Sequence, residues 1–291
     1  MFQHCLICTD FEDGLQRFAS FVADLAQTGI RKFIFLHTVS VWEDERLTNV
    51  DSHKLEEAKA YLQSLIKDVP VDVEVKIEVS SVRYLDQIHQ LIDTEAIDLI
   101  MVGMPVSSDL ENKLFGSHTH ELIKSTEVPV LILRPQLIST YTFEELSLRC
   151  RHLWQHLLIP YDDSPAGRYM LEGLRQRLAA NPDHRVESCH FLWVVEDGVR
   201  RPEIQTLRQS EAEAKLAELQ TEFAQWVSQC TTEVRTGNPL HEIIDTAFIK
   251  DINAIAVGSF RKGLLDWAVP SVADSVLNRS WFPLLFFSPK S

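Results

Sequence analysis

The stretch FQHCLICTDFED, residues 2–13, recurs later in the chain as WQHLLIPYDDSP, residues 154–165. Each copy begins with an aromatic residue and a Gln-His pair, continues through an apolar run and reaches an aspartate. The apolar run has the length of a buried strand, so each copy predicts a strand that ends close to a carboxylate. A pattern of this length that occurs twice indicates an internal repeat.

Two further anchors repeat in the same order. IDLIMVGMP (97–105) matches INAIAVGSF (252–260), and EVPVLIL (127–133) matches WFPLLFF (281–287). Three anchors at a nearly constant spacing indicate a duplicated domain with small insertions or deletions. We therefore assign domain 1 to residues 1–135, domain 2 to residues 153–291 and a linker to residues 136–152.

Each half alternates predicted strands with predicted helices. In domain 1, apolar residues at helical spacing predict a helix near residues 12–28, between strands near 4–9 and 32–41. VDVEVKIEVS, residues 71–80, alternates apolar with polar residues, which predicts a strand with one wet face near a sheet edge. The alternation of strands with helices along the chain favours parallel strand pairing, with helices on both faces of the sheet. The sequence thus predicts two tandem doubly wound α/β sandwich domains, each with a five-stranded, mostly parallel sheet.

The composition excludes several classes of partner. The chain has 291 residues and a formal net charge of −14. This charge disfavours nucleic acid, because such binding depends on many Lys and Arg side chains at phosphates. No apolar run is long enough to cross a membrane, and the first residues lack the features of a secretory signal. We expect a cytoplasmic protein with neither nucleic acid nor membrane as a partner.

Two local patterns suggest chemistry but favour plainer interpretations. Cys5 and Cys8 form a C-x-x-C, yet they lie within one predicted strand, where residues three apart point to opposite faces. We expect buried structural thiols. His118 and His120 stand near a predicted helix start without further ligands, whereas a metal site needs three or four convergent ligands. We predict no metal site.

Polar residues follow three of the predicted strands in each half. The first strand ends in Thr9-Asp10 or Tyr161-Asp162. The second ends in HTV (37–39) or WVV (193–195), and the fourth ends in a glycine, followed by a loop and a serine. In doubly wound sheets, ligands sit beyond the carboxyl ends of the strands. We therefore expect any ligand site to lie here.

These features resemble the universal stress protein family. Its members carry an aspartate after the first strand and the motif Gly-x2-Gly-x9-Gly-Ser/Thr before the last helix. SVADSVLNRSWFPLLFF, residues 271–287, is also similar to the family's ending. The resemblance covers nearly the whole chain as two tandem copies, and it implies an adenine nucleotide alpha hydrolase-like fold. Some members bind ATP or related nucleotides and others do not.

The resemblance implies candidate nucleotide-binding residues in both halves. The aspartate is expected near the ribose and phosphates, and the end of the second strand near the adenine. The glycines and the serine would bring N–H and hydroxyl donors to a phosphate. The candidates in domain 1 are Thr9, Asp10, Val39, Gly103, Gly116 and Ser117, and the degenerate counterpart in domain 2 comprises Asp162, Val195, Gly258, Arg261 and Ser271. ATP or AMP is the implied ligand, and no cofactor is required.

Both copies of the motif depart from the family pattern. In domain 1, Val106 stands where the middle glycine is expected, and a β-branched residue adopts a positive φ only at a cost. In domain 2, Arg261 and Pro270 replace two glycines, and proline contributes no N–H donor. Arg261 could meet an anion through its side chain, although a solvated surface charge is the plainer interpretation. We expect a weak, partly retained site in domain 1 and a degenerate one in domain 2.

Three functions remain open from the sequence. The first is a stress-response protein that binds an adenine nucleotide in domain 1. The second is an interaction or scaffold protein without nucleotide, whose two domains pack through their last strands as an intramolecular pseudo-dimer, with a homodimer as a further option. The third, a slow ATPase, ranks last because Asp10 is the only evident general base. We therefore expect no enzyme.

Overall fold

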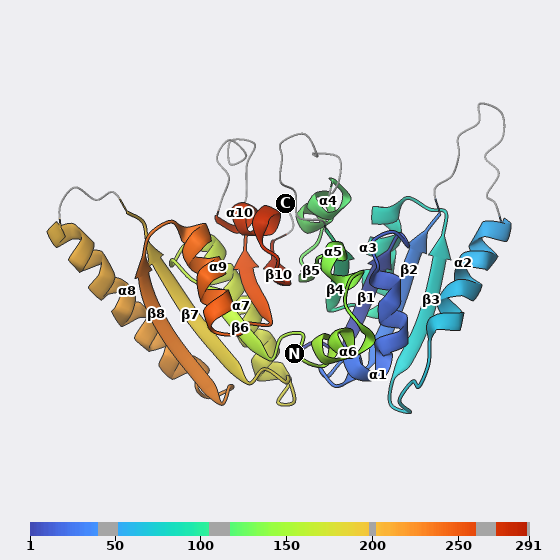
Figure 1. The fold of residues 1–291 in the computed structure, drawn as a ribbon, viewed down its shortest axis with the longest axis horizontal. Coiled ribbons are helices and arrows are strands. Elements are labelled where there is room, and N and C mark those ends of the chain that lie inside the picture. The colour runs from blue at the N-terminus through green and yellow to red at the C-terminus, as the bar shows by residue number, and fades with distance from the viewer. Residues whose placement is uncertain (40–51, 105–116, 198–201, 260–271, 290–291) are drawn as a thin grey trace.

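The computed structural model describes residues 1–39, 52–104, 117–197, 202–259 and 272–289. Two similar halves lie side by side, joined by a helical linker (Figure 1). Domain 1 contains β1 (His4–Thr9), η1 (Leu15–Phe21), α1 (Val22–Ala26), β2 (Lys32–Thr38), α2 (Ser52–Leu65), β3 (Glu74–Ser80), α3 (Tyr84–Glu95), β4 (Leu99–Gly103), α4 (Ser117–Ser125) and β5 (Val130–Leu133).

The linker and domain 2 complete the chain. The linker forms α5 (Pro135–Ile138) and α6 (Phe143–Arg151). Domain 2 contains β6 (His156–Pro160), α7 (Pro165–Ala180), β7 (Ser188–Val195), α8 (Pro202–Phe223), β8 (Gln229–Thr236), α9 (Pro239–Ile249), β9 (Ala254–Gly258), α10 (Val272–Arg279) and β10 (Leu284–Phe287).

The strands form one ten-stranded sheet in the order β3-β2-β1-β4-β5-β10-β9-β6-β7-β8. Within each half all strands run parallel, and the order is the doubly wound one that the sequence predicts. The halves meet where β5 and β10 pair antiparallel, with Leu131 opposite Leu285. The prediction that the last strands join the halves is therefore confirmed. What we expected as two sheets is one continuous sheet.

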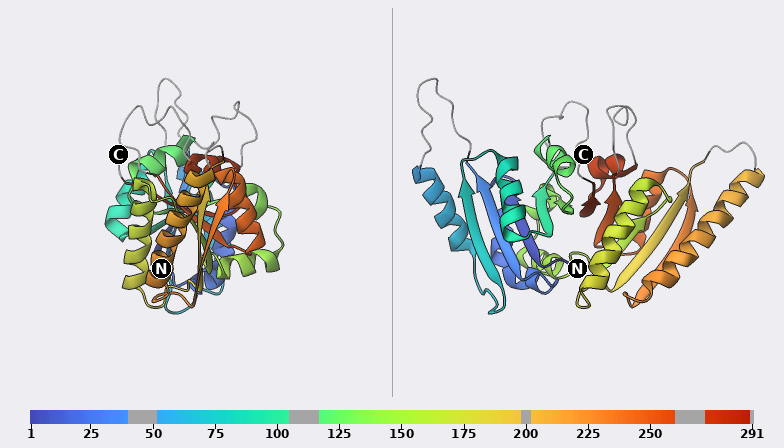
Figure 2. Two further views of the ribbon diagram at one scale, coloured as in Figure 1. Left: turned by 90° about the vertical axis from the view of Figure 1, so that its left-hand side faces the viewer. Right: turned by 180° about the vertical axis from the view of Figure 1, so that it is seen from behind.

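Helices cover both faces of this sheet (Figure 2). η1, α1, α2, α7 and α8 contribute apolar residues to one core cluster, while α3, α4, α9 and α10 contribute to the other. Cys5 lies in the first cluster and Cys8 in the second, so the two thiols point to opposite faces as predicted. The strand that the alternating stretch predicts is β3, and it lies at a sheet edge as expected.

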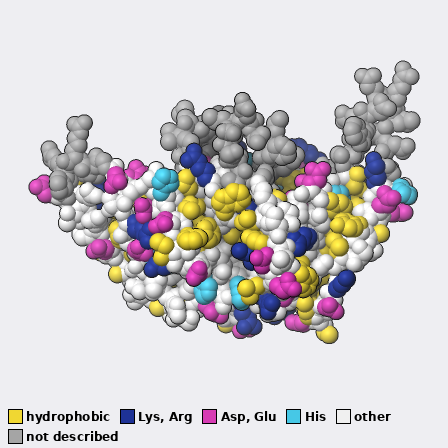
Figure 3. All heavy atoms as spheres, in the orientation of Figure 1, with side chains coloured by type: hydrophobic (Ala, Val, Ile, Leu, Met, Phe, Trp, Pro, Cys, Tyr) yellow, Lys and Arg dark blue, Asp and Glu magenta, His cyan; other side chains and the backbone are white. Residues whose placement is uncertain are grey.

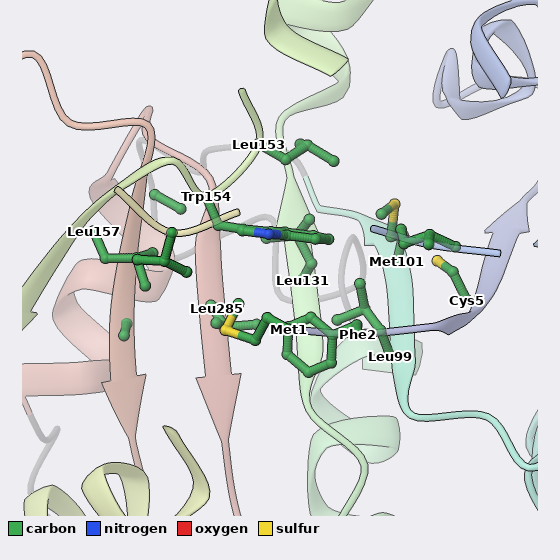
Figure 4. Packing of buried hydrophobic residues seen from close by; sticks show 14 of the residues in the cluster. Met1, Phe2, Cys5, Leu99, Met101, Leu131, Leu153, Trp154, Leu157 and Leu285 are labelled. Carbon is green, nitrogen blue, oxygen red and sulfur yellow. The ribbon is translucent and has the colours of Figure 1, made fainter. Parts of the chain in front are cut away.

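Each core cluster continues from one half into the other. Trp154, which follows the linker, is 1% exposed, and its ring meets the edge of Phe2 at a centroid distance of 5.4 Å. Figure 4 shows both rings beside Leu131 and Leu285, the central residues of the two joined strands. Burial of two aromatic rings in this position stabilises the contact between the halves by several kcal/mol, on the order of 2–3 per ring.

One predicted helix is wrong in form. The apolar spacing over residues 12–28 suggests one helix, but the chain forms a turn, then the 3-10 helix η1 and then the short helix α1. Gly14 adopts a positive φ of 75° in that turn, and Phe11 one of 69°. A helix cannot pass through such residues, so it starts only at Leu15. The domain 2 counterpart, α7, is regular because Ser164 caps it and Pro165 occupies its first turn.

Candidate functional site

The turn after β1 uses Asp10 to bind its own backbone. One carboxylate oxygen, Oδ1, accepts hydrogen bonds from the N–H groups of Glu12 and Asp13, each at 2.8 Å. The hydroxyl group of Thr9 accepts a hydrogen bond from the N–H of Phe11 at 3.1 Å and donates a hydrogen bond to Oδ1 of Asp13 at 3.0 Å. Both predicted residues, Thr9 and Asp10, therefore stabilise this turn. Sequence reasoning missed Asp13, because its counterpart in the second copy of the repeat, Pro165, has no carboxyl group.

Asp13 has an unusual electrostatic position. Its burial raises the pKa of the carboxyl to about 7, while hydrogen bonds from Leu15 and Thr9 act in the opposite direction. An added Cβ at Gly103 would lie 2.9 Å from Oδ2 of Asp13, so this carboxyl group sits against the predicted glycine. In its ionised form this carboxyl group at the end of β4 opposes a triphosphate, because like charges repel at short range.

An aromatic pair occupies the end of β2 in domain 1. The ring of Phe11 stacks on His37 with a centroid distance of 3.8 Å and an interplanar angle of 6°, and Tyr61 meets Phe11 edge-on. His37 donates from Nδ1 to the carbonyl of Thr9 at 2.9 Å, and burial lowers the pKa of this imidazole. Val39, the predicted residue here, donates its N–H to Ser80. A side chain of the protein thus covers the surface where the resemblance implies an adenine.

Domain 2 has open space at the equivalent strand ends. The ends of β6, β7 and β9 line a cavity of about 470 Å³, a size typical of small-molecule sites. The predicted residues Asp162 and Gly258 both line it. The starts of α7, α9 and α10 also border it. Three helix N-termini therefore face the same space.

Individual side chains of domain 2 define the polarity of this cavity. Asp162 accepts a hydrogen bond from the N–H of Ser164 at 3.1 Å through Oδ1. Val195 is buried and does not line the cavity, whereas Val194 and Glu196 do, because alternate residues of a strand face opposite sides. The described lining carries two carboxylates, those of Asp162 and Glu196, and no lysine or arginine.

The two fourth-strand glycines have a packing role. An added Cβ at Gly258 would lie 2.4 Å from the carbonyl oxygen of Ala166, so the first turn of α7 crosses β9 in direct contact. At Gly103 the close neighbour is the side chain of Asp13. Each glycine therefore admits the segment that follows the first strand of its own half, whether or not a phosphate binds beyond it.

Several predicted residues lie outside the described part of the chain. These are Gly116, Arg261 and Ser271, together with the motif positions Val106 and Pro270. Ser117 is the first residue of α4. Their role in a ligand site stays a prediction.

The described surface and helices bear on the other expected partners. On the face drawn in Figure 3, acidic and basic side chains are interspersed among the described residues. No helix in the described ranges is both long and apolar enough to span a membrane. Within those ranges, no cluster of three or more His, Cys, Asp or Glu side chains is arranged to hold a metal ion.

The fold defines a tandem α/β sandwich protein with two similar halves. The sequence model of the Universal stress protein family matches residues 1–134 and 154–288. The chain belongs to the universal stress protein family, as its repeated motifs predicted.

Solved structures of similar proteins support the same fold. A universal stress protein from Archaeoglobus fulgidus DSM 4304 is 18% identical, with a TM-score of 0.62 and coverage of 98% of each chain. A putative universal stress protein from Pseudomonas aeruginosa UCBPP-PA14 is 15% identical, with a TM-score of 0.60, and covers 99% of this chain and 94% of its own. No curated protein matches the chain. At these identities the likeness concerns the fold alone.

Proposed function

We propose that this protein is a stress-response protein that binds an adenine nucleoside or its monophosphate weakly, in the cavity of domain 2. Membership of the universal stress protein family supports the stress response. The observation that carries the ligand is the 470 Å³ cavity at the carboxyl ends of β6, β7 and β9, the position where doubly wound sheets bind ligands. A cytoplasmic location is part of the same proposal.

The polarity of the cavity favours a nucleoside over a triphosphate. Asp162 is exposed, and its Oδ2 accepts no hydrogen bond from the described residues, so it is free to accept one from a ribose hydroxyl. Glu196 adds a second carboxylate, and the described lining supplies no cationic side chain to balance three phosphates. Apolar residues such as Val194, Met170 and Ile243 offer contact surface for a base.

The sequence motif supports a second location. Domain 1 retains Asp10, Gly103, Gly116 and Ser117, the last of which begins α4, and these residues would form a partly retained, weak site for ATP or AMP. Against it stand the ring of Phe11, which lies over His37, and the carboxyl group of Asp13 at Gly103. The geometry of the described residues therefore favours domain 2, although the motif is better kept in domain 1.

Matched variants separate the two locations. Thr38 and Val194 are equivalent in the repeat, so Val194→Phe fills the strand-end site of domain 2 and Thr38→Phe that of domain 1. We expect the full chain to bind adenosine or AMP in a calorimetric titration, with binding lost in Val194→Phe and kept in Thr38→Phe and Gly116→Val. The reverse pattern assigns the site to domain 1. Absence of binding at millimolar adenosine, AMP and ATP refutes the nucleotide function.

One observation favours the scaffold function as a second candidate. The antiparallel pairing of β5 with β10, and the core clusters that cross it, join the two halves into one pseudo-dimer. Such a body suits an interaction protein whose binding surfaces are held at a fixed distance. If no adenine compound binds, we expect this function, and a pull-down with Val194→Phe should recover the same partners as the original chain.

A further inference from the structure

A second cavity lies where the linker crosses the junction of the two domains. It has a volume of about 60 Å³. Its walls come from Phe18 and Leu133 of domain 1, from α6 of the linker, and from Asn253 and Pro283 of domain 2. None of its described lining residues borders the strand-end cavity of domain 2. At this size it admits about two water molecules or one carboxylate group, and it excludes a nucleotide.

Arg134 gives this cavity a buried positive charge. The residue is 2% exposed, and its guanidinium donates to the carbonyls of Met104 at 3.0 Å and Leu277 at 2.6 Å. Its Nε has no hydrogen-bond partner among the described residues. No carboxylate in the described ranges forms an ion pair with it, and burial lowers the pKa of this guanidinium to about 10, which leaves it charged at neutral pH. This N–H group has no surface open to the cavity, so the guanidinium acts on a ligand through its charge and its other N–H groups.

The rest of the lining complements an anion with an apolar part. The described lining includes the basic residues Arg134, Arg149 and His152 and no aspartate or glutamate, although the chain as a whole has a net charge of −14. Arg149 lies over the ring of Tyr141 at 4.2 Å, which holds its guanidinium beside the cavity. Asn253 accepts a hydrogen bond from the N–H of His156 through Oδ1, so its Nδ2 remains a donor.

Most of the remaining lining residues are apolar. They are Phe18, Leu133, Leu137, Ile138, Leu146 and Leu153, with Trp281 half exposed among them. A fully hydrated inorganic anion gains nothing from such a wall, whereas a short alkyl chain gains about 0.8 kcal/mol per buried methylene. Figure 1 shows α5 and α6 of the linker against domain 1, near its junction with domain 2.

We propose that this cavity binds the carboxylate end of a small alkyl carboxylate of two to four carbons. The carboxylate accepts hydrogen bonds from Arg134, Arg149 and Asn253, and the alkyl chain, which exceeds the enclosed space, packs against the apolar residues at its edge. Because domain 1, the linker and domain 2 each supply part of the wall, an occupied site stabilises the contact between the halves. The site is independent of the proposed adenine site.

The test uses the full chain and butyrate as the probe. Saturation-transfer NMR at constant ionic strength and pH 7.5 measures binding of butyrate, with n-butylammonium, phosphate and chloride for comparison. We expect butyrate to bind, and n-butylammonium, phosphate and chloride not to displace it. Absence of butyrate binding at 50 mM, or displacement of butyrate by phosphate or chloride at equal concentration, overturns the proposal.

Two variants and one control locate the site, and all three leave intact the contact between Arg134 and Leu277 that joins the domains. Arg149→Gln should weaken butyrate binding about tenfold, the effect of losing one charge-assisted hydrogen bond. Asn253→Asp keeps the acceptor for His156 but replaces the donor with a negative charge, and it should abolish binding. Arg151→Gln, on the same helix but outside the cavity, is the control and should bind normally. Butyrate binding that is unaffected by Arg149→Gln and Asn253→Asp places it elsewhere and refutes the proposal.

Discussion

The glycines that end β4 and β9 occupy equivalent positions of the repeat, yet we expect substitution by alanine to have unequal costs. At Gly258 the new Cβ would lie 2.4 Å from the carbonyl oxygen of Ala166 and 3.0 Å from Cβ of Met170. Both neighbours belong to α7, so the helix itself has to shift. At Gly103 the nearest atoms are Oδ2 and Cβ of Asp13, at 2.9 and 3.0 Å, and Cδ1 of Leu15 at 3.1 Å; all three belong to side chains, and the carboxyl oxygen and the Leu15 methyl can turn aside so that only a small shift of the Asp13 Cβ remains.

The magnitudes follow from the atoms that move. Overpacking that displaces backbone typically costs about 1–3 kcal/mol, and we expect Gly258→Ala near the upper end, about 3 kcal/mol. Gly103→Ala displaces the carboxyl of Asp13 from its bonds to Thr9 and Leu15, which costs about 1 kcal/mol. Neither glycine has a positive φ, so backbone strain adds nothing to the difference.

Urea denaturation followed by far-UV circular dichroism measures both costs. We expect the unfolding midpoint of Gly258→Ala to fall clearly further than that of Gly103→Ala, with unchanged denaturant dependence. Gly258→Ala should also reduce any binding in the cavity of domain 2, since α7 forms one of its walls. Equal costs, or a larger cost at Gly103, would show that the fourth-strand glycines are not explained by packing.

Three further predictions concern single residues. Burial raises the pKa of Asp13 to about 7, above its value in the unfolded chain, so the carboxyl group stabilises the fold in acid and this stabilisation is lost as pH rises through 7. The free energy of unfolding of Asp13→Asn, compared with that of the original chain in urea titrations, should therefore be more favourable to the variant at pH 9 than at pH 5. Phe11→Ala uncovers His37, so the pKa of that imidazole should rise toward its usual value in an NMR titration; an unchanged pKa contradicts the role of burial. Trp154→Ala should lower the free energy of unfolding by about 4 kcal/mol, and Trp154→Phe by clearly less, because the indole N–H has no partner among the described residues; equal losses would contradict this.

Much of the fold could be predicted because the chain contains it twice. Buried strands such as β1 and β4 are apolar runs bounded by polar residues, and β3 alternates as an edge strand does. The repeat of EVPVLIL in WFPLLFF also indicated which strands join the halves. The break after β1 could not be predicted, since periodicity detects an apolar face but not the positive φ of Phe11 and Gly14.

The candidate site was harder to predict than the fold. The sequence selected Asp10, Asp162 and both fourth-strand glycines, and the structure places all four at the carboxyl ends of the sheet. It could not show that Phe11 covers His37 in domain 1, or that the described residues of domain 2 line a cavity. That difference depends on how side chains fill space between distant segments, and a motif records only residue types along the chain.

The junction of β5 with β10 also has an evolutionary consequence. In a symmetric dimer of identical chains, every substitution appears at both copies of a surface, so a change that closes one site closes both. Here the two copies lie in one polypeptide, and each can change without the other. The residue equivalent to Phe11 in domain 2 is Asp163, which has no aromatic ring. A cavity lies beside Asp162 although domain 2 lacks two of the motif glycines. The covalent link keeps the two halves paired at any protein concentration and frees them to specialise.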